Sequence, residues 1–361
     1  MKTLLKPLSL ALFVAATLPT QSAYIRTSPP SDTIPVIGPS SHFCKAIGGP
    51  EDEEGNSLIQ TSDGGYAIAG STTSFGAGGA DVYVVKLDAK GNLQWTKTIG
   101  GPKDDRGFSL IQTSDGGYAI AGYTTSFGAG GADVYVVKLD AKGNLQWTKT
   151  IGGPAREEGH SLIQTSDGGY AIAGYTRSFG AGDYDVYLLK LDANGNLQWT
   201  KTISAKNADF NILKLSLIQT SDGGYAIAGF TVSFGAGGTD VYVVKLDAKG
   251  NLQWTKTIGG PTIEAGNSLI QTSDGGYAIA GTTGSFGAGL LDVYVVKLDA
   301  NGNLQWTKTI GGPESEAGFS LIQTSDGGYA IAGYTSSFDA GDLDVYVVKL
   351  DKNRSVESRV G

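Results

Sequence analysis

Two sets of carboxylates recur at regular positions along this chain of 361 residues. One set stands three residues after each Gly-Gly-Pro: Glu53, Asp105, Glu157, Glu264 and Glu316. The other opens each copy of Asp-Val-Tyr: Asp81, Asp133, Asp185, Asp240, Asp292 and Asp344. Carboxylates are hard oxygen ligands that suit Ca²⁺, so calcium binding is one interpretation of both sets. The structural interpretation is that each Asp caps backbone N–H groups where a strand or turn begins.

A glycine-rich segment, residues 127–135, nearly matches the calcium-binding nonapeptide GGxGxDxUx. Such β-rolls need tandem nonapeptides, whereas this segment occurs once in each repeat, so the signal is weak. We therefore predict no cofactor, with Ca²⁺ as the one candidate ligand.

Catalytic constellations are missing from the sequence. The two histidines are His42 and His160, and neither has a recognisable nucleophile motif nearby. No glycine-rich phosphate loop opens a helix, and no Cys or His cluster has metal-ligand spacing. Near-identical repeats also place the same residues at every site, whereas catalysis needs different residues in different roles. These features predict that the chain is not an enzyme, with a propeller enzyme as the remote alternative.

Aromatic side chains follow the same repeat. Four of them come directly after the segment Ala-Ile-Ala-Gly: Tyr123, Tyr175, Phe230 and Tyr334. Such rings could stack on sugars. In the alternative interpretation they pack between neighbouring repeats.

The elements that position these side chains are copies of one unit. The segment SLIQTSDGGYAIAG occurs six times, at spacings of 52, 52, 55, 52 and 52 residues. A unit of this length cannot bury a core alone, which leaves a closed ring or an open stack.

One unit, residues 109–154, contains four segments rich in β-branched and aromatic residues: SLIQT, GYAIAGYT, DVYVVKLD and LQWTKTIGG. Gly and Asp between them predict tight turns, as at residues 114–117. Four antiparallel strands per unit predict a propeller blade. We therefore expect an all-β fold, a six-bladed β-propeller.

The sixth unit ends at Asp351 without its fourth strand, and the missing strand lies at the other end of the chain. Phe43 stands 52 residues before Trp95, and Ile47 stands 52 before Ile99. We expect residues 41–49 to complete the last blade and close the ring, because closure removes an open sheet edge. An open solenoid is the alternative, but the atypical capping units of open stacks are missing.

The run LDAKGNLQWTKTIGG resembles the tryptophan-bearing motif of kelch-like and pyrroloquinoline-quinone type propeller blades. The whole unit resembles more closely the TSDGGY…GN..W repeats of secreted bacterial and archaeal β-propeller proteins, over residues 41–351. This second resemblance implies a propeller fold and an extracytoplasmic setting. No cofactor-binding residue carries over from the quinoprotein likeness.

The N-terminus has the features of an exported protein. Lysines precede an apolar run at residues 8–18, which is too short to span a bilayer. We assign residues 1–23 to a signal peptide, 24–40 to a Pro/Ser-rich linker, 41–351 to the propeller and 352–361 to a tail. The protein is therefore expected to be secreted or periplasmic. Cys44 is the sole cysteine, which excludes an intramolecular disulfide.

Variation among the repeats collects in the crossovers between units and in the loops between second and third strands, which belong to one face of a propeller. A face that diverges while the other stays constant is typical of a binding surface. Exposed loops that simply drift are the alternative. The net charge of −8 argues against nucleic acid and against anionic membranes as partners.

The most divergent crossover, residues 204–215, is three residues longer than the others and lacks Gly-Gly-Pro. It breaks the ring's symmetry, and its Asp209, Phe210 and Lys214 are candidate specificity residues, unless this repeat has simply decayed. We predict a monomeric, non-catalytic binding module or scaffold. A protein partner is the first choice and a glycan, bound through several equivalent sites as in a lectin, is the second.

Overall fold

The computed structural model describes residues 43, 45–181, 184–203, 215–338 and 343–353. Within these residues the chain forms strands β1 to β23 and no helix. The strands belong to six separate antiparallel sheets, five with four strands and one with three. The predicted all-β fold of four-stranded units is confirmed.

Each sheet takes its strands in chain order. The first three sheets contain β1 (Glu53–Gln60), β2 (Tyr66–Thr72), β3 (Asp81–Leu87) and β4 (Leu93–Ile99); β5 (Asp105–Gln112), β6 (Tyr118–Thr124), β7 (Asp133–Leu139) and β8 (Leu145–Ile151); and β9 (Glu157–Gln164), β10 (Tyr170–Thr176), β11 (Asp185–Leu191) and β12 (Leu197–Ile203). The others contain β13 (Ser216–Gln219), β14 (Tyr225–Thr231), β15 (Asp240–Leu246) and β16 (Leu252–Ile258); β17 (Glu264–Gln271), β18 (Tyr277–Thr283), β19 (Asp292–Leu298) and β20 (Leu304–Ile310); and β21 (Glu316–Gln323), β22 (Tyr329–Thr335) and β23 (Asp344–Leu350).

The invariant turn TSDGG is held by a buried lysine. In the second sheet Gly116 has a φ of 80°, which glycine adopts without steric cost. The carboxylate of Asp115 accepts a hydrogen bond from the Gly117 N–H at 3.0 Å. Lys138 Nζ lies beneath the turn, 2.9 Å from Asp115 Oδ2 and 3.0 Å from the Leu139 carbonyl oxygen. The turn and the third strand therefore depend on each other.

The same turns also join neighbouring sheets. The Ser114 N–H donates to Gln164 Oε1 of the next sheet at 2.8 Å, and Ser62 does the same to Gln112. The bond recurs at Ser166, Ser221 and Ser273. On this face of the ring the turns hold neighbouring sheets together, which accounts for their lack of sequence variation.

The core lies between the sheets. Ala67, Ala69, Val82 and Val84 of the first sheet pack in one buried cluster with side chains of the second, including Leu110, Tyr118 and Ile120. Equivalent clusters fill the next four junctions. Because the middle strands are covered on both faces, they are apolar without alternation.

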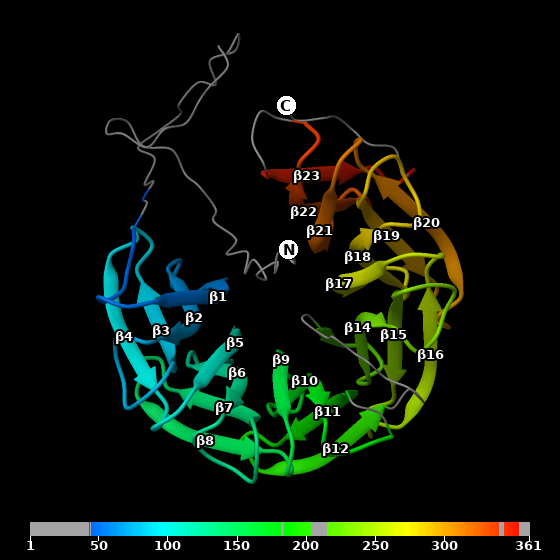
Figure 1. Cartoon of the computed structure of the whole chain (residues 1–361). Coiled ribbons are helices and arrows are strands. Elements are labelled where there is room, and N and C mark those ends of the chain that lie inside the picture. The colour runs from blue at the N-terminus through cyan, green and yellow to red at the C-terminus, as the bar shows by residue number, and fades with distance from the viewer. Residues whose placement is uncertain (1–42, 44, 182–183, 204–214, 339–342, 354–361) are drawn as a thin grey trace, which may run out of the picture.

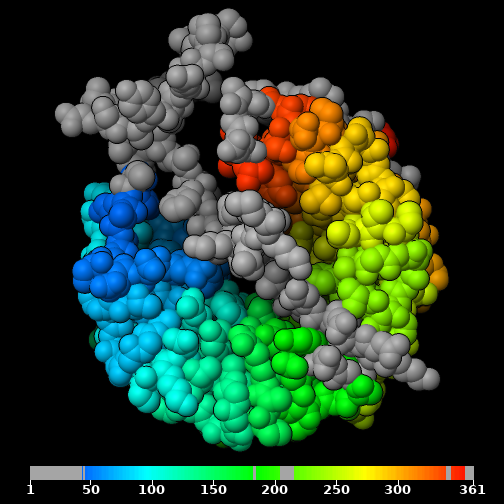
Figure 2. All heavy atoms as spheres, viewed as in Figure 1, coloured from blue at the N-terminus to red at the C-terminus, as the bar shows by residue number. Residues whose placement is uncertain are grey.

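The six sheets stand around a central axis, with the first strand of each near the axis and the fourth at the rim (Figure 1). In the space-filling view the described sheets pack against one another in chain order around the arc (Figure 2). The sheets of β1 and β23 are the two ends of this arc (Figure 1).

The predicted fourth strand of the last sheet is not formed by the described residues. β23 pairs with β22, and residues 43 and 45–49 carry no strand. Val345 and Val347 of β23 are consequently 71% and 54% exposed, and Leu58 of β1 is 47% exposed. Their counterparts at the other junctions are buried. The ring is therefore open in this structure, with an apolar sheet face at each end.

Several predicted features lie outside the described residues. These are the signal peptide, the linker, nearly all of the crossover at 204–215 with Asp209, Phe210 and Lys214, and most of the C-terminal tail. In the part of the chain that the structure describes, no helix is long and apolar enough to cross a membrane.

Candidate ligand-binding face

The strand register places the variable loops together. In the first sheet Glu53 pairs with Thr72, Thr72 with Asp81 and Val82 with Ile99. The crossovers and the loops between second and third strands therefore share one end of every sheet, as predicted. We call this end the variable face, and its described residues are 48–52, 73–80, 100–104, 125–132, 152–156, 177–181, 184, 215, 232–239, 259–263, 284–291, 311–315, 336–338 and 343.

The carboxylates that follow Gly-Gly-Pro are internal ties. Glu157 is fully buried, and its Oε2 accepts a hydrogen bond from the Gly153 N–H at 2.6 Å. Its Oε1 accepts from Thr176 Oγ1 at 2.7 Å and from the Ser178 N–H at 3.0 Å. Glu264 and Glu316 are equally buried and bond in the same way, and Glu53 makes the matching bonds in a half-buried position. The shorter Asp105 is also buried, and its Oδ2 accepts hydrogen bonds from the Gly101 N–H at 2.6 Å and from Ser126 Oγ at 2.7 Å.

The Asp that opens the third strand is also buried in the first five sheets, and Asp344 of the last sheet is half-buried. Asp133 Oδ2 accepts a hydrogen bond from the Ala129 N–H at 3.1 Å, which fits the capping interpretation. Its other oxygen and the carboxylate of Glu157, from the next sheet, both adjoin Gly152. Burial first, and then the charge of Glu157, raise the pKa of Asp133 above its ordinary value.

The two carboxylate sets thus meet in pairs between neighbouring sheets. Asp81 with Asp105, Asp240 with Glu264 and Asp292 with Glu316 repeat the arrangement. No three His, Cys, Asp or Glu side chains gather in a metal-binding group among the described residues.

The predicted rim aromatics turn inward. Tyr123 and Tyr175 are buried, and Phe230 and Tyr334 are half-buried. The His160 ring stacks on Phe108 at 5.0 Å and on Tyr175 at 5.4 Å, and so connects the second sheet to the third. These contacts fit the interpretation in which the rings pack between repeats.

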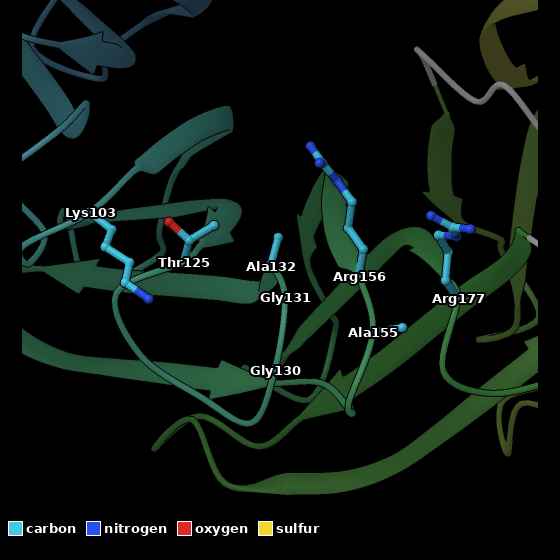
Figure 3. A pocket seen from close by; sticks show the side chains of 8 residues that line it. All are labelled: Lys103, Thr125, Gly130, Gly131, Ala132, Ala155, Arg156 and Arg177. Atoms are coloured by element: carbon cyan, nitrogen blue, oxygen red, sulfur yellow. The ribbon is translucent and has the colours of Figure 1, made fainter.

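A shallow hollow of about 480 Å³ lies on the variable face between the second and third sheets. Figure 3 shows the residues that line it: Lys103, Thr125, Gly130, Gly131, Ala132, Ala155, Arg156 and Arg177. Three of them are positively charged and none is acidic. These three are also the positively charged residues among the described residues of the variable face.

The sequence analysis missed these three side chains, although a signal was present. Where the second unit has Lys103, the first has Glu51, and where the third has Arg156, the first has Asp52. Arg177 likewise replaces the Thr or other neutral residue that follows the second strand elsewhere.

Arg156 is held in place by its neighbours. Its Nε lies 2.6 Å from Glu158 Oε1 and 3.2 Å from the Tyr175 hydroxyl, and its guanidinium lies over the Tyr123 ring at 5.5 Å. Burial alone would raise the pKa of Glu158, but the contact of its Oε2 with His160 Nε2 at 3.1 Å and the charge of Arg156 lower it below its ordinary value. Arg156 and Glu158 therefore form an oriented ion pair at the edge of the hollow.

Residues 80–352 match the model of a protein family described as outer membrane protein assembly factor BamB. The chain belongs to this family. A curated relative is the regulatory protein FlaEY of Caulobacter vibrioides, 29% identical over 166 residues. That match covers 39% of this BamB-family chain and 17% of the relative, so the chain spans a small part of that protein.

Solved structures that are similar to this chain include the Neurospora crassa Pan2 WD40 domain, at 12% identity and a TM-score of 0.46, covering 81% of this chain and 88% of that one. The Penicillium chrysogenum α-L-arabinanase has 13% identity and a TM-score of 0.47, with coverage of 82% and 92%. The exo-β-1,3-galactanase of Phanerochaete chrysosporium has 14% identity and a TM-score of 0.41, with coverage of 73% and 62%.

The prediction that the chain is not an enzyme is wrong. The solved structures that are similar to this chain include enzymes, namely the arabinanase and the galactanase. The argument failed because one set of loops on a repeated scaffold can carry residues found in no other repeat, as Lys103, Arg156 and Arg177 do here.

Proposed function

We propose that this chain is an exported β-propeller that binds a protein partner through its variable face. Its family is described as an assembly factor, and assembly acts through contacts between proteins. The observation that carries the proposal is the hollow at Lys103, Arg156 and Arg177. There, positively charged side chains break the symmetry of the repeats. A rigid scaffold with one distinct site can orient a single partner.

The proposal includes a closed ring. At four junctions a Cβ placed on the third residue of the first strand would stand 2.9 to 3.1 Å from an isoleucine of its own sheet and 3.1 to 3.3 Å from a valine of the preceding sheet. These glycine and valine pairs are Gly107 with Val82, Gly159 with Val134, Gly266 with Val241 and Gly318 with Val293. The matching pair, Gly55 with Val345, is the one that closure would create. The exposed valines of β23 and Leu58 of β1 would then be buried, as their counterparts are.

Export supports the same function. The N-terminal residues 1–23 have the pattern of a signal peptide, and the unit resembles repeats of secreted propellers. We propose a secreted or periplasmic location for the mature protein.

A multivalent glycan-binding role is the second candidate, and one observation favours it. Each sheet carries a phenylalanine on the loop between its second and third strands, between 40% and 43% exposed: Phe75, Phe127, Phe179, Phe234, Phe286 and Phe338. Each of these rings packs beside a tyrosine of the third strand, as Phe127 does with Tyr135 at 5.9 Å. Equivalent half-exposed rings around a scaffold suit a repetitive ligand.

Photo-crosslinking tests the protein-partner proposal. A photoreactive amino acid at Thr125, in the hollow, is compared with one at Lys142, on a turn of the opposite face. We expect a discrete adduct with an envelope protein from position 125 and none from 142. Equal adducts from both positions, or none from 125, would contradict binding through the variable face.

A glycan array with Ca²⁺ present tests the second candidate. Binding to related sugars that is lost on replacing Phe127 and Phe179 by serine would support the glycan role. A blank array would leave the protein partner as the function to pursue.

A further inference from the structure

We infer that the hollow between the second and third sheets binds carboxylate side chains of an acidic peptide segment. This inference rests on the proposed function, since it names the chemistry of the partner at the same face. Its basis is the arrangement of charge and of satisfied polar groups around the hollow.

Two of the three cations in the hollow are not neutralised within the described structure. Lys103 and Arg177 form no ion pair with a described residue, whereas Arg156 is paired with Glu158 and Arg106, outside the hollow, with Glu54. The chain as a whole carries a net charge of −8. A local surplus of positive charge in an acidic protein attracts anionic groups specifically to this place.

Polar groups on the floor of the hollow are already bonded within the protein at Gly131 and Thr125. The Gly131 N–H donates to the Ala155 carbonyl oxygen at 2.9 Å. The Thr125 hydroxyl accepts from the Asp104 N–H at 3.0 Å and donates to the Asp104 carbonyl oxygen at 2.9 Å. Recognition therefore falls to the cationic side chains, while the small residues of the floor allow a peptide chain to approach closely.

The guanidinium groups are partly oriented before a ligand arrives. Arg177 lies over the Tyr184 ring at 4.9 Å, and Arg156 is fixed by Glu158 and Tyr123. Holding a long side chain in place reduces the entropy lost on binding. A guanidinium presents a planar fork of N–H donors, which matches a carboxylate in two parallel hydrogen bonds.

The size of the hollow fits side chains rather than a folded surface. Its volume of about 480 Å³ lies in the lower part of the range of ligand sites, roughly 300 to 1,000 Å³. Such a space accepts one or two acidic side chains of an extended segment, and the Glu or Asp side chains of a protein partner supply them.

Binding of a fluorescein-labelled decaglutamate peptide to residues 24–361 tests the inference by fluorescence anisotropy at low salt. The variant K103Q/R177Q removes the two unpaired charges, and K142Q/K249Q removes two charges from turns of the opposite face. We expect the first variant to bind about tenfold more weakly and the control to bind within about twofold of the parent protein. All four side chains are exposed, so unchanged melting curves confirm that the variants fold.

Three results would overturn the inference. Equal weakening by both variants would show general electrostatic attraction, without a site. Displacement of the peptide by inorganic phosphate at equal concentration of charge would show a small-anion site. Binding of oligoglucuronate in place of decaglutamate would assign the hollow to an acidic glycan.

The crosslinking experiment separates this inference from the proposed function. Adducts at Thr125 that persist in K103Q/R177Q, together with no peptide binding, would retain the partner and reject the acidic segment. Loss of both peptide binding and adducts in K103Q/R177Q, but not in the control, would support the inference.

Discussion

The ring of Phe43 lies 5.6 Å from the ring of Tyr66, at an interplanar angle of 66°. The same edge contact joins Trp95 of the first sheet to Tyr118 of the second, at 5.5 Å and 71°. The contact recurs at the next four junctions, where the centroids of the Trp and Tyr rings lie 5.6 to 5.8 Å apart. Phe43 therefore occupies the place on the first sheet that the fourth strand of a preceding sheet would give it, although that strand is not paired with β23.

Ring closure predicts a specific disulfide. In a C44S background, cysteines at Gly55 and Val345 should oxidise to an intramolecular bond, because closure brings them as close as Gly107 and Val82 are now. The measurement is the fraction of free thiol and the mobility of the monomer on non-reducing gels.

The matched control for closure is the pair G107C with V82C, at a junction that is already packed. If the control oxidises while the G55C/V345C pair keeps its free thiols, the ring stays open in solution. A crosslinked dimer from the G55C/V345C pair would mean that the open ends meet between two molecules.

Removing the anchor of the N-terminal segment should destabilise the ring. Phe43 and Ile47 pack on Tyr83, Val85 and Leu87 of the first sheet. Replacing Phe43 by alanine should cost about 1.5 kcal/mol of unfolding free energy, the lower end of the value for burying a large apolar side chain. Replacing it by tryptophan, the residue at this place in the repeat, should preserve stability. Chemical denaturation measures both.

Deleting residues 24–49 is the stronger form of this test. It exposes the apolar face of the first sheet and removes the segment that we expect to pair with the free edge of β23, so the protein should melt earlier and self-associate. An unchanged melting temperature with a monomeric elution profile would argue against any role of this segment in closure.

The buried lysine of each sheet should matter more in the interior of the arc than at its end. Lys138 is 3% exposed and holds Asp115 and the Leu139 carbonyl, whereas Lys349, paired with Asp326, is 28% exposed. K138M should cost about 1 to 3 kcal/mol, because it leaves a buried carbonyl without its donor. K349M should cost less. The opposite order in denaturant titrations would refute this account of the turn.

Stability should also depend on the buried Asp at each junction. Burial raises the pKa of Asp133 above its ordinary value of 3.8, so the folded state binds this proton more tightly than the unfolded chain. This contribution favours the fold below the ordinary pKa and is lost as the pH rises through the raised pKa. D133N cannot ionise, so it should lose less stability than the parent between about pH 4 and pH 7.

D140N is the control for this pH dependence. Asp140 lies on an exposed turn, and its hydrogen bonds with Asn144 lower its pKa below the ordinary value. Its contribution is therefore lost only as the pH falls through that lowered pKa, and D140N should keep the parent's slope near neutrality. A D133N slope identical to the parent's would show that Asp133 is not the group that titrates.

The sequence by itself determined the parts of this protein that depend on neighbours in the chain. The turn at Asp115 and Gly116, the strands on either side of it and the shared end of the variable loops all follow from local residue types and antiparallel pairing. These elements are the same in every repeat, so each of the six copies supports the same prediction of strands and turns.

The tertiary structure alone decided where side chains of different sheets meet. Lys103, Arg156 and Arg177 come from two crossovers and a loop, and they share a hollow because the second and third sheets pack side by side. The same packing turns Tyr175 inward and buries Glu157 against its own loop, away from the surface where a ligand would bind. Local residue types cannot specify such contacts, since they depend on the angle and distance between whole sheets.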